Sequence, residues 1–257
     1  MSLTLDGLSV RVGDRLLLKN LSLSVAPNEV VALIGSSGSG KSLTAAAITG
    51  SLPGSARATG HLEIQGQDVP LATRFRPGLA VVRQDSLTAL HPLVRIGRQL
   101  VPVLLRSGAA TTRAAAMSLA ASTLGDVGFA DPLRVLQSFP MELSGGQRQR
   151  VCIVQALACR ASFLVADEPT TALDVVSRQL VLSALRKAAD AGAGILLITH
   201  DVAAAASLCS RAVVIDDGTV VDQGSFAHLA GSTAHPHACA LMGSAGDAAA
   251  RGSIAAV

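Results

Sequence analysis

Residues 35–42 read GSSGSGKS and satisfy the pattern G-x-x-x-x-G-K-[ST] at every position. They directly follow an apolar run, VVALI at 30–34, and precede a stretch that we expect to be helical. Glycines let the backbone turn tightly so that successive N–H groups point inward, and the following helix aims its positive end at the same point. The pattern therefore requires a strand, a loop and a helix in that order, and it predicts a phosphate-binding site rather than a Gly/Ser-rich surface loop.

Individual positions of this loop have distinct predicted roles. Lys41 would place its ammonium between the β- and γ-phosphates of a nucleoside triphosphate, and Ser42 would offer its hydroxyl to Mg²⁺. A loop of this kind is by itself compatible with kinases, GTPases and helicases. The predicted nucleotide contacts in the loop are Gly35, Ser36, Ser37, Gly38, Ser39, Gly40, Lys41, Ser42 and Leu43.

A second apolar run ends in an acidic pair, in FLVADE at 163–168. Asp167 stands at the end of a predicted buried strand, where its carboxylate suits contact with Mg²⁺ or its water. Glu168 follows directly and is a candidate general base for polarising the attacking water. An acidic pair after a strand often only caps a helix. Its place about 125 residues beyond the phosphate loop favours the catalytic interpretation.

Two kinds of apolar pattern predict the fold. Alternating apolar and polar residues indicate half-buried antiparallel strands, whereas continuous apolar runs suit central parallel strands covered on both faces. The alternating segments are residues 3–10, 21–25 and 61–65, and the continuous runs are 30–34, 163–166 and 195–199. Helical stretches lie between the continuous runs, so we predict an α/β fold: a P-loop NTPase core with a mostly parallel sheet and an N-terminal antiparallel β subdomain.

Two further segments stand apart from this pattern. Residues 93–140 contain no strand-like run and are rich in Leu, Ala and Arg, so we predict an inserted α-helical subdomain at about 88–160. Residues 212–223 predict a hairpin that turns at Asp217-Gly218, because this dipeptide tolerates positive φ.

Composition excludes several classes of protein. The 257 residues are 49% hydrophobic and 15% charged, so we expect a single globular domain over 1–242 and a disordered tail over 243–257. Five Phe, no Trp, no Tyr and a net charge of +3 argue against a nucleic-acid partner. We find no signal peptide and no run of about 20 apolar residues that would span a membrane.

The segment LSGGQ at 143–147, followed by RQR, narrows the class of nucleotide-binding protein to which the chain can belong. Ser144 with the backbone of Gly145 and Gly146 predicts a second anion site at a helix N-terminus. With LSGGQ between the phosphate loop and FLVADE, the chain resembles the ABC ATPase family. The resemblance implies that Ser144, Gly145, Gly146 and Gln147 contact an ATP held by a second subunit, and that ATP and Mg²⁺ are the cofactors.

The resemblance assigns roles at four further positions. Gln84, in VVRQDS, matches a glutamine that contacts Mg²⁺ and water, and is counted among both the catalytic and the metal residues. Asp174, in ALD, matches a loop at the subunit interface, and His200, in ITHD, matches a histidine that contacts the γ-phosphate. Val12 takes the place of an aromatic residue that usually stacks on adenine. The resemblance thus implies Glu168, His200 and Gln84 as catalytic, and Ser42, Gln84 and Asp167 as metal-binding.

Four segments resemble the ATPases of the peptide and nickel importer group, and most closely the nickel-type first ATPase subunit. They are QDSLTALHP, FPMELSGGQRQRV, DEPTTALDV and HPHACALM. The resemblance implies an ATP-hydrolysing importer subunit, peripheral on the cytoplasmic face of the inner membrane. It implies membrane permease subunits, a second ABC ATPase (a related chain or a copy) and an extracytoplasmic solute-binding protein as partners.

Other interpretations remain open at this point. A non-transport ABC ATPase usually carries two cassettes or a long coiled-coil insertion, for which 93–140 is too short. An ABC exporter subunit is disfavoured by residues 84–92 and 235–242, and a regulator without turnover by Glu168 and His200. His235 and His237 could suggest a metal site, but we favour their interpretation as ordinary surface residues. The sequence leaves the transported solute open.

Overall fold

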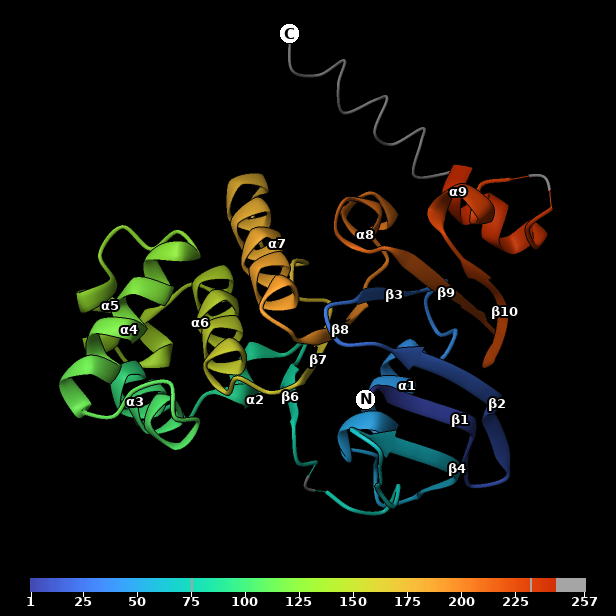
Figure 1. Cartoon of the computed structure of the whole chain (residues 1–257), viewed down its shortest axis with the longest axis horizontal. Helices are drawn as coiled ribbons and strands as arrows, with labels where there is room; N and C mark the ends of the chain where they lie inside the picture. The colour runs from blue at the N-terminus through green and yellow to red at the C-terminus, as the bar shows by residue number, and fades with distance from the viewer. Residues whose placement is uncertain (75, 232, 244–257) are drawn as a thin grey trace, which may run out of the picture.

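The computed structural model describes residues 1–74, 76–231 and 233–243. It contains a four-stranded sheet, a six-stranded sheet and a group of helices beside the larger sheet (Figure 1). This arrangement confirms the predicted α/β fold. The predicted tail at 243–257 lies outside the described residues except for Gly243.

The smaller sheet is antiparallel and has the order β2-β1-β4-β5. Side chains of β1 alternate between buried and more exposed positions, so one face of the sheet contributes to the core, as the period of two predicts. The three predicted alternating strands are confirmed. The strands are β1 (Leu3–Val12), β2 (Arg15–Val25), β4 (Ala56–Ile64) and β5 (Gln67–Asp68).

The larger sheet has the order β10-β9-β3-β8-β7-β6 and is parallel except for its last strand, β10. Every residue of β3 and β8 is buried, because helices or the smaller sheet cover both faces. The strands are β3 (Val30–Ile34), β6 (Leu79–Val82), β7 (Phe163–Asp167), β8 (Gly194–Ile198), β9 (Arg211–Asp216) and β10 (Thr219–Gly224).

Two hydrophobic clusters hold the larger sheet in place. One lies between the two sheets and includes residues of α1 (Lys41–Thr49), which packs against β7 and β8. The other lies on the opposite face, beneath α7 (Val175–Asp190) and α8 (Val202–Leu208) (Figure 1). The sheet is therefore the buried centre of the molecule, and its strand ends are the accessible parts.

The remaining helices pack around a third cluster of buried side chains, from Leu90 to Ala158. In α3 the residues Ile96, Leu100 and Leu104 recur every four positions and are all buried, so one stripe of the helix faces this cluster. The helices are α2 (Ser86–Ala89), α3 (Ile96–Arg106), α4 (Arg113–Asp126), α5 (Pro132–Gln137), η1 (Pro140–Glu142) and α6 (Gly145–Ala158).

The predicted hairpin is confirmed between β9 and β10. Asp217 has φ 41° and Gly218 has φ 75°, the left-handed pair that a two-residue turn requires. A Cβ at Gly218 would lie 2.0 Å from the carbonyl oxygen of Leu17, so this turn also packs against β2. The short helix α9 (Phe226–Leu229) follows. In the part of the chain that the structure describes, no helix is both long and apolar enough to cross a bilayer.

Candidate functional site

Parallel pairing brings three strand ends to one edge of the larger sheet. Leu33 of β3 pairs with Ile198 of β8, and Ile198 also aligns with Asp167 of β7. The segments that leave these strands therefore begin side by side: the loop at 35–40, the acidic pair at 167–168 and the Thr199-His200 turn. The sequence motifs far apart along the chain meet here because the strands are parallel and in register.

The loop at 35–40 is held in the form that a phosphate cradle needs. Gly40 has φ 112° and lies directly before α1, and no side chain caps the N-terminus of that helix. A Cβ on Gly35 would lie 2.2 Å from the carbonyl oxygen of Ile215, so only glycine allows this approach of the loop to β9. The first N–H groups of α1 are consequently available to an anion.

Lys41 bends back over this loop. Its Nζ donates to the carbonyl oxygens of Gly35 and Ser36, at 2.8 Å each. Burial lowers the pKa of Lys41, while the carboxylates of Glu168 and Asp167 oppose that shift. The ammonium is thus a localised positive charge beside the helix N-terminus, and phosphate oxygens can take the place of the two carbonyls.

Asp167 fits a hard divalent cation. Its Oδ1 is buried and has no hydrogen-bond partner among the residues that the structure describes. Burial, and then the neighbouring Glu168 carboxylate, raises the pKa of Asp167, and Lys41 acts in the opposite direction. Ser42 and Asp167 line the same small pocket of about 150 Å³, together with Arg83. A hydroxyl and an unpaired carboxylate oxygen at one pocket match the oxygen ligands that Mg²⁺ prefers.

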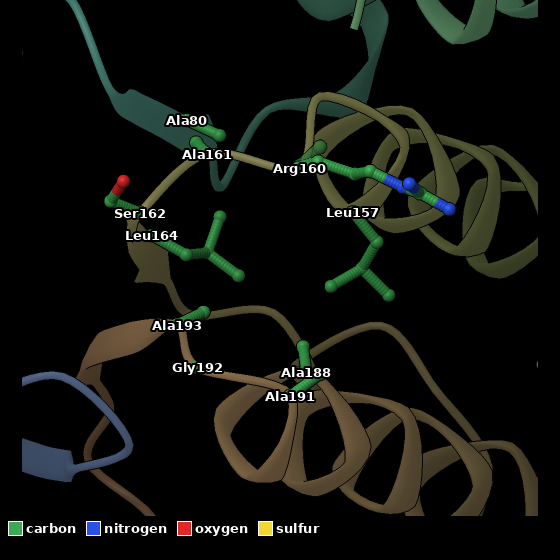
Figure 2. A pocket seen from close by; sticks show the side chains of 11 residues that line it. Ala80, Leu157, Arg160, Ala161, Ser162, Leu164, Ala188, Ala191, Gly192 and Ala193 are labelled. Atoms are coloured by element: carbon green, nitrogen blue, oxygen red, sulfur yellow. The ribbon is translucent and has the colours of Figure 1, made fainter. Parts of the chain in front are cut away.

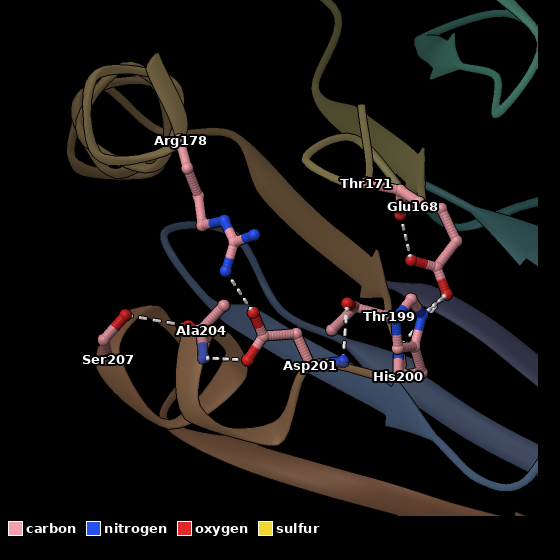
Figure 3. Close-up of polar contacts among 8 residues, drawn as sticks. All are labelled: Glu168, Thr171, Arg178, Thr199, His200, Asp201, Ala204 and Ser207. Carbon is pink, nitrogen blue, oxygen red and sulfur yellow. Dashed lines mark hydrogen bonds and ion pairs between the residues drawn. The ribbon is translucent and has the colours of Figure 1, made fainter. Parts of the chain in front are cut away.

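Glu168 and His200 are in direct contact (Figure 3). Glu168 Oε1 lies 2.8 Å from His200 Nδ1 and accepts the backbone N–H of His200 at 3.1 Å. Thr171 Oγ1 donates to Glu168 Oε2 at 2.7 Å. Glu168 has φ 49°, a left-handed conformation that costs energy for a residue with a Cβ. The surrounding contacts therefore hold this carboxylate in one orientation at the strand ends.

The LSGGQ segment begins α6, as predicted. Ser144 Oγ accepts the N–H of Gln147 at 3.3 Å, and Gln147 Oε1 accepts the N–H of Ser144 at 2.9 Å. A Cβ on Gly146 would lie 2.9 Å from the carbonyl oxygen of Ala172, so the helix tip packs closely on the loop before α7. As the structure describes them, the pockets at the phosphate loop contain no residue of 144–147. The N-termini of α1 and α6 are therefore separate in this chain, and contact of 144–147 with a nucleotide stays a prediction.

Two other predicted residues occupy loops near the site. Asp174 caps α7, since its carboxylate accepts the N–H of Ser177 at 2.9 Å and its hydroxyl at 2.7 Å. These hydrogen bonds lower the pKa of Asp174. Gln84 is exposed in the connection from β6 to α2, and Gln149 of α6 donates to the neighbouring Arg83 carbonyl at 3.4 Å. Contact of Asp174 with nucleotide and of Gln84 with metal stays a prediction.

A pocket beside the phosphate loop contains residues that the sequence analysis missed. It has a volume of about 350 Å³, and its walls include Leu16 and Leu17 of β2, which are 40% and 41% exposed. Asp217 of the hairpin turn also lines it, whereas Val12 does not. The signal in the sequence is the run of three leucines at 16–18, which breaks the alternation of β2. The predicted adenine contact at Val12 stays a prediction. The full lining is Leu16, Leu17, Gly38, Gly40, Lys41, Ser42, Leu43, Asp217 and Gly218.

A larger pocket of about 530 Å³ lies away from this edge (Figure 2). It is bounded by the start of β7 and the C-terminal ends of α6 and α7, and most of its lining is alanine. Among the described residues that line it, Arg160 is the one with a charge. Helix C-termini carry partial negative charge and disfavour phosphate. This larger pocket is therefore less suited to phosphate than the loop at 35–42.

A glycine-lined loop between a strand and a helix, at the same sheet edge as an acidic pair two strands away, defines a P-loop nucleotide-binding protein. Residues 18–171 match the family model described as ABC transporter. The chain belongs to this family.

Curated relatives are similar in sequence over most of the length of this chain. It is 39% identical over 233 residues to the oligopeptide transport ATP-binding protein OppD of Mycobacterium tuberculosis, covering 88% of the chain and 38% of that protein. It is 36% identical over 255 residues to the dipeptide transport ATP-binding protein DppD of Escherichia coli, covering 93% and 77%. The chain thus spans well under half the length of the mycobacterial relative.

Solved structures share the fold. One described as the ATP-binding subunit of an ABC transporter has a TM-score of 0.75 and 27% identity, covering 90% of this chain and 92% of that one. Another, a dimeric ATP-binding cassette in a post-hydrolysis state with ADP and Pi, has a TM-score of 0.75 and 26% identity, covering 88% and 98%. Both similarities agree with the α/β fold predicted from the sequence.

The raised pKa of Asp167 predicts a stabilising substitution. Above its folded-state pKa the carboxylate is a buried charge that the unfolded chain keeps in water, so Asp167→Asn should raise the melting temperature of the nucleotide-free protein near pH 7.5. This gain should shrink as the pH falls toward 3.8, the ordinary value for Asp, because the wild-type group then becomes neutral. Thermal unfolding across this pH range measures the difference. Asp14→Asn, in an exposed turn, is the control, and an equal gain there would contradict the assignment.

Proposed function

We propose that this chain is an ATP-binding and ATP-hydrolysing subunit that powers an ABC importer. The main observation behind the proposal is that four side chains lie together at one edge of the sheet: Lys41, Asp167, Glu168 and His200. This edge combines a cradle for phosphates, a carboxylate for a cation and a carboxylate–imidazole pair for hydrolysis. These are the parts that phosphoryl transfer to water requires.

Mg²⁺ would be held by the Ser42 hydroxyl and the Asp167 carboxylate, with Gln84 as a further ligand. The cation would neutralise negative charge on the phosphates, which Lys41 and the N–H groups at the start of α1 also stabilise. The unpaired Oδ1 of Asp167 supports this assignment, since a buried carboxylate oxygen without a donor is otherwise unfavourable.

Glu168 is the proposed general base. Its carboxylate would accept the proton of the attacking water, while His200 orients the carboxylate and the terminal phosphate. In this structure Oε1 is engaged by His200 and Oε2 by Thr171. The base is therefore held in place before substrate arrives, and its contact with His200 has to loosen for Oε1 to bind water.

The second half-site would act on a neighbouring subunit. The helix tip at 144–147 presents N–H groups and a serine hydroxyl but, in the described part of the chain, lines neither pocket at the loop at 35–42. Two chains arranged head to tail would each close this tip over the nucleotide of the other. The partner is either a copy of this chain or a related ATPase.

Transport is inferred from relatives. OppD and DppD are described as oligopeptide and dipeptide transport proteins, which favours peptides as the solute over nickel. The permease would bind near residues 85–100, where Leu93 is 80% exposed, and a solute-binding protein would deliver substrate from outside.

The chain would then lie on the cytoplasmic face of the inner membrane. A non-transport ABC ATPase and an exporter subunit remain the alternatives.

Glu168→Gln tests the base. The substitution keeps the shape of the side chain but removes its basicity, so turnover should fall by about 10²–10⁴-fold while ATP still binds. The variant should also accumulate as a nucleotide-bound dimer, which size-exclusion chromatography with ATP detects. Glu63→Gln, on the antiparallel sheet, is the matched control and should keep wild-type turnover. Unchanged turnover in Glu168→Gln would remove this residue from the role.

Ser144→Arg tests the two-subunit site. The long side chain would block the helix tip, so hydrolysis by the assembled complex should be lost while the isolated subunit binds ATP with unchanged affinity. Ser225→Arg places the same change at the N-cap of α9 and should leave hydrolysis intact. Loss of ATP binding by the isolated Ser144→Arg subunit would show that the tip serves its own loop instead.

The solute is tested in cells that lack this chain. Uptake of labelled dipeptide should fall and should return when the wild-type chain is supplied, but not when Glu168→Gln is supplied. Uptake of labelled nickel is measured in the same cells. A selective loss of nickel uptake would replace peptide by nickel as the solute, and unchanged uptake of both would favour a non-transport or export role.

A further inference from the structure

Arg178 connects the first turns of α7 to the turn that carries His200. Its backbone N–H donates to the carbonyl of Asp174 at 2.9 Å, one helical turn earlier. Its guanidinium Nη1 lies 2.8 Å from Asp201 Oδ2 (Figure 3). The side chains of Arg178 and Asp201 are 37% and 27% exposed, so this ion pair is half-buried between two helices.

Asp201 is fixed by contacts from three directions. Its Oδ1 accepts the N–H of Ala204 at 2.9 Å and so caps α8, while its Oδ2 faces Arg178. Its own N–H donates to Thr199 Oγ1 at 3.0 Å. His200 lies between Thr199 and Asp201 in the chain, so these contacts determine where the backbone of His200 lies.

The ion pair closes a ring of contacts around the hydrolytic residues. Glu168 contacts His200 on one side and Thr171 on the other. The loop from Thr171 runs to Asp174, which caps α7 through Ser177. Arg178 of α7 then contacts Asp201, the residue after His200, and so completes the ring. Arg178 thus links α7 to the turn that carries His200, in addition to the packing of α7 on α8.

We propose that Arg178 is a positioning residue that couples the loop at 171–174 to the Glu168–His200 pair. A shift of the N-terminal end of α7 would move the guanidinium, and Asp201 would carry His200 with it. The inference rests on the proposed function, because it concerns the same hydrolytic site. Arg178 touches neither substrate nor metal in this proposal and acts through Asp201.

Folding stability is a poor measure of such a pair. Ion pairs that remain partly exposed add little to stability, since the Coulombic gain is offset by loss of hydration and side-chain freedom. Removing Arg178 should therefore alter the position of His200 while changing the melting temperature little. The appropriate readout is kcat separated from KM.

The chain provides a matched control on the same helix. Arg186 lies two turns further along α7 and donates to the carbonyl of Leu208, at the other end of α8. Arg186→Gln removes an arginine link between the same two helices without touching Asp201. Arg178→Gln and Arg186→Gln thus make the same chemical change on one helix, but only Arg178→Gln removes a contact with the residue next to His200.

The experiment measures ATP hydrolysis and ATP affinity for the assembled transporter complex. Arg178→Gln should lower kcat by about tenfold with KM and ATP affinity changed less than twofold, the pattern of a lost transition-state interaction. Arg178→Lys should recover most of the loss, and Arg186→Gln should retain wild-type kcat. Asp201→Asn keeps an N-cap for α8, so its effect should match that of Arg178→Gln. The double variant should be no slower than the slower single variant.

The outcomes separate this inference from the proposed function. Absence of ATP hydrolysis in the wild-type complex would refute the proposed function itself. Wild-type hydrolysis together with equal kcat values in Arg178→Gln and Arg186→Gln would overturn only the role of Arg178. Additive losses in the double variant would likewise overturn it, since they would mean that the two residues act separately.

Discussion

Parallel hydrogen bonding among β3, β8 and β7 is the constraint on which this structure depends. These strands are buried on both faces and aligned in register, so their carboxyl ends finish at one edge. The backbone hydrogen bonds are satisfied within the sheet up to that edge. Beyond it the chain has to find other partners, and the loop at 35–40 and Glu168 do so in left-handed or strained conformations.

The site concentrates charge that the fold does not neutralise. Lys41 bonds to loop carbonyls instead of a carboxylate, and Asp167 keeps a buried oxygen without a donor in the described part of the chain. Such features reduce the stability of the empty protein, but they leave groups of both signs ready for a polyanion and a cation. Thr171 and His200 meanwhile restrain the carboxylate of Glu168, the proposed base.

The loop before α7 contacts both the tip of α6 and the acidic residue that follows β7. It packs against Gly146 at the tip of α6, and through Thr171 it reaches Glu168. The same loop ends in the cap of α7, where Arg178 begins the connection back to Asp201. A displacement at the tip of α6 can therefore be transmitted to the Glu168–His200 pair through packed backbone and a few hydrogen bonds, without a large change in the sheet.

The sequence by itself determined the elements and the motifs. Apolar runs identified β3, β7 and β8, and the Gly-rich loop and LSGGQ identified two helix N-termini, because both signals depend on neighbouring residues along the chain. Only the tertiary structure decided which side chains meet across elements. The Leu16–Leu17 wall beside Asp217 and the Arg178–Asp201 pair join residues far apart in sequence, and no local periodicity encodes such contacts.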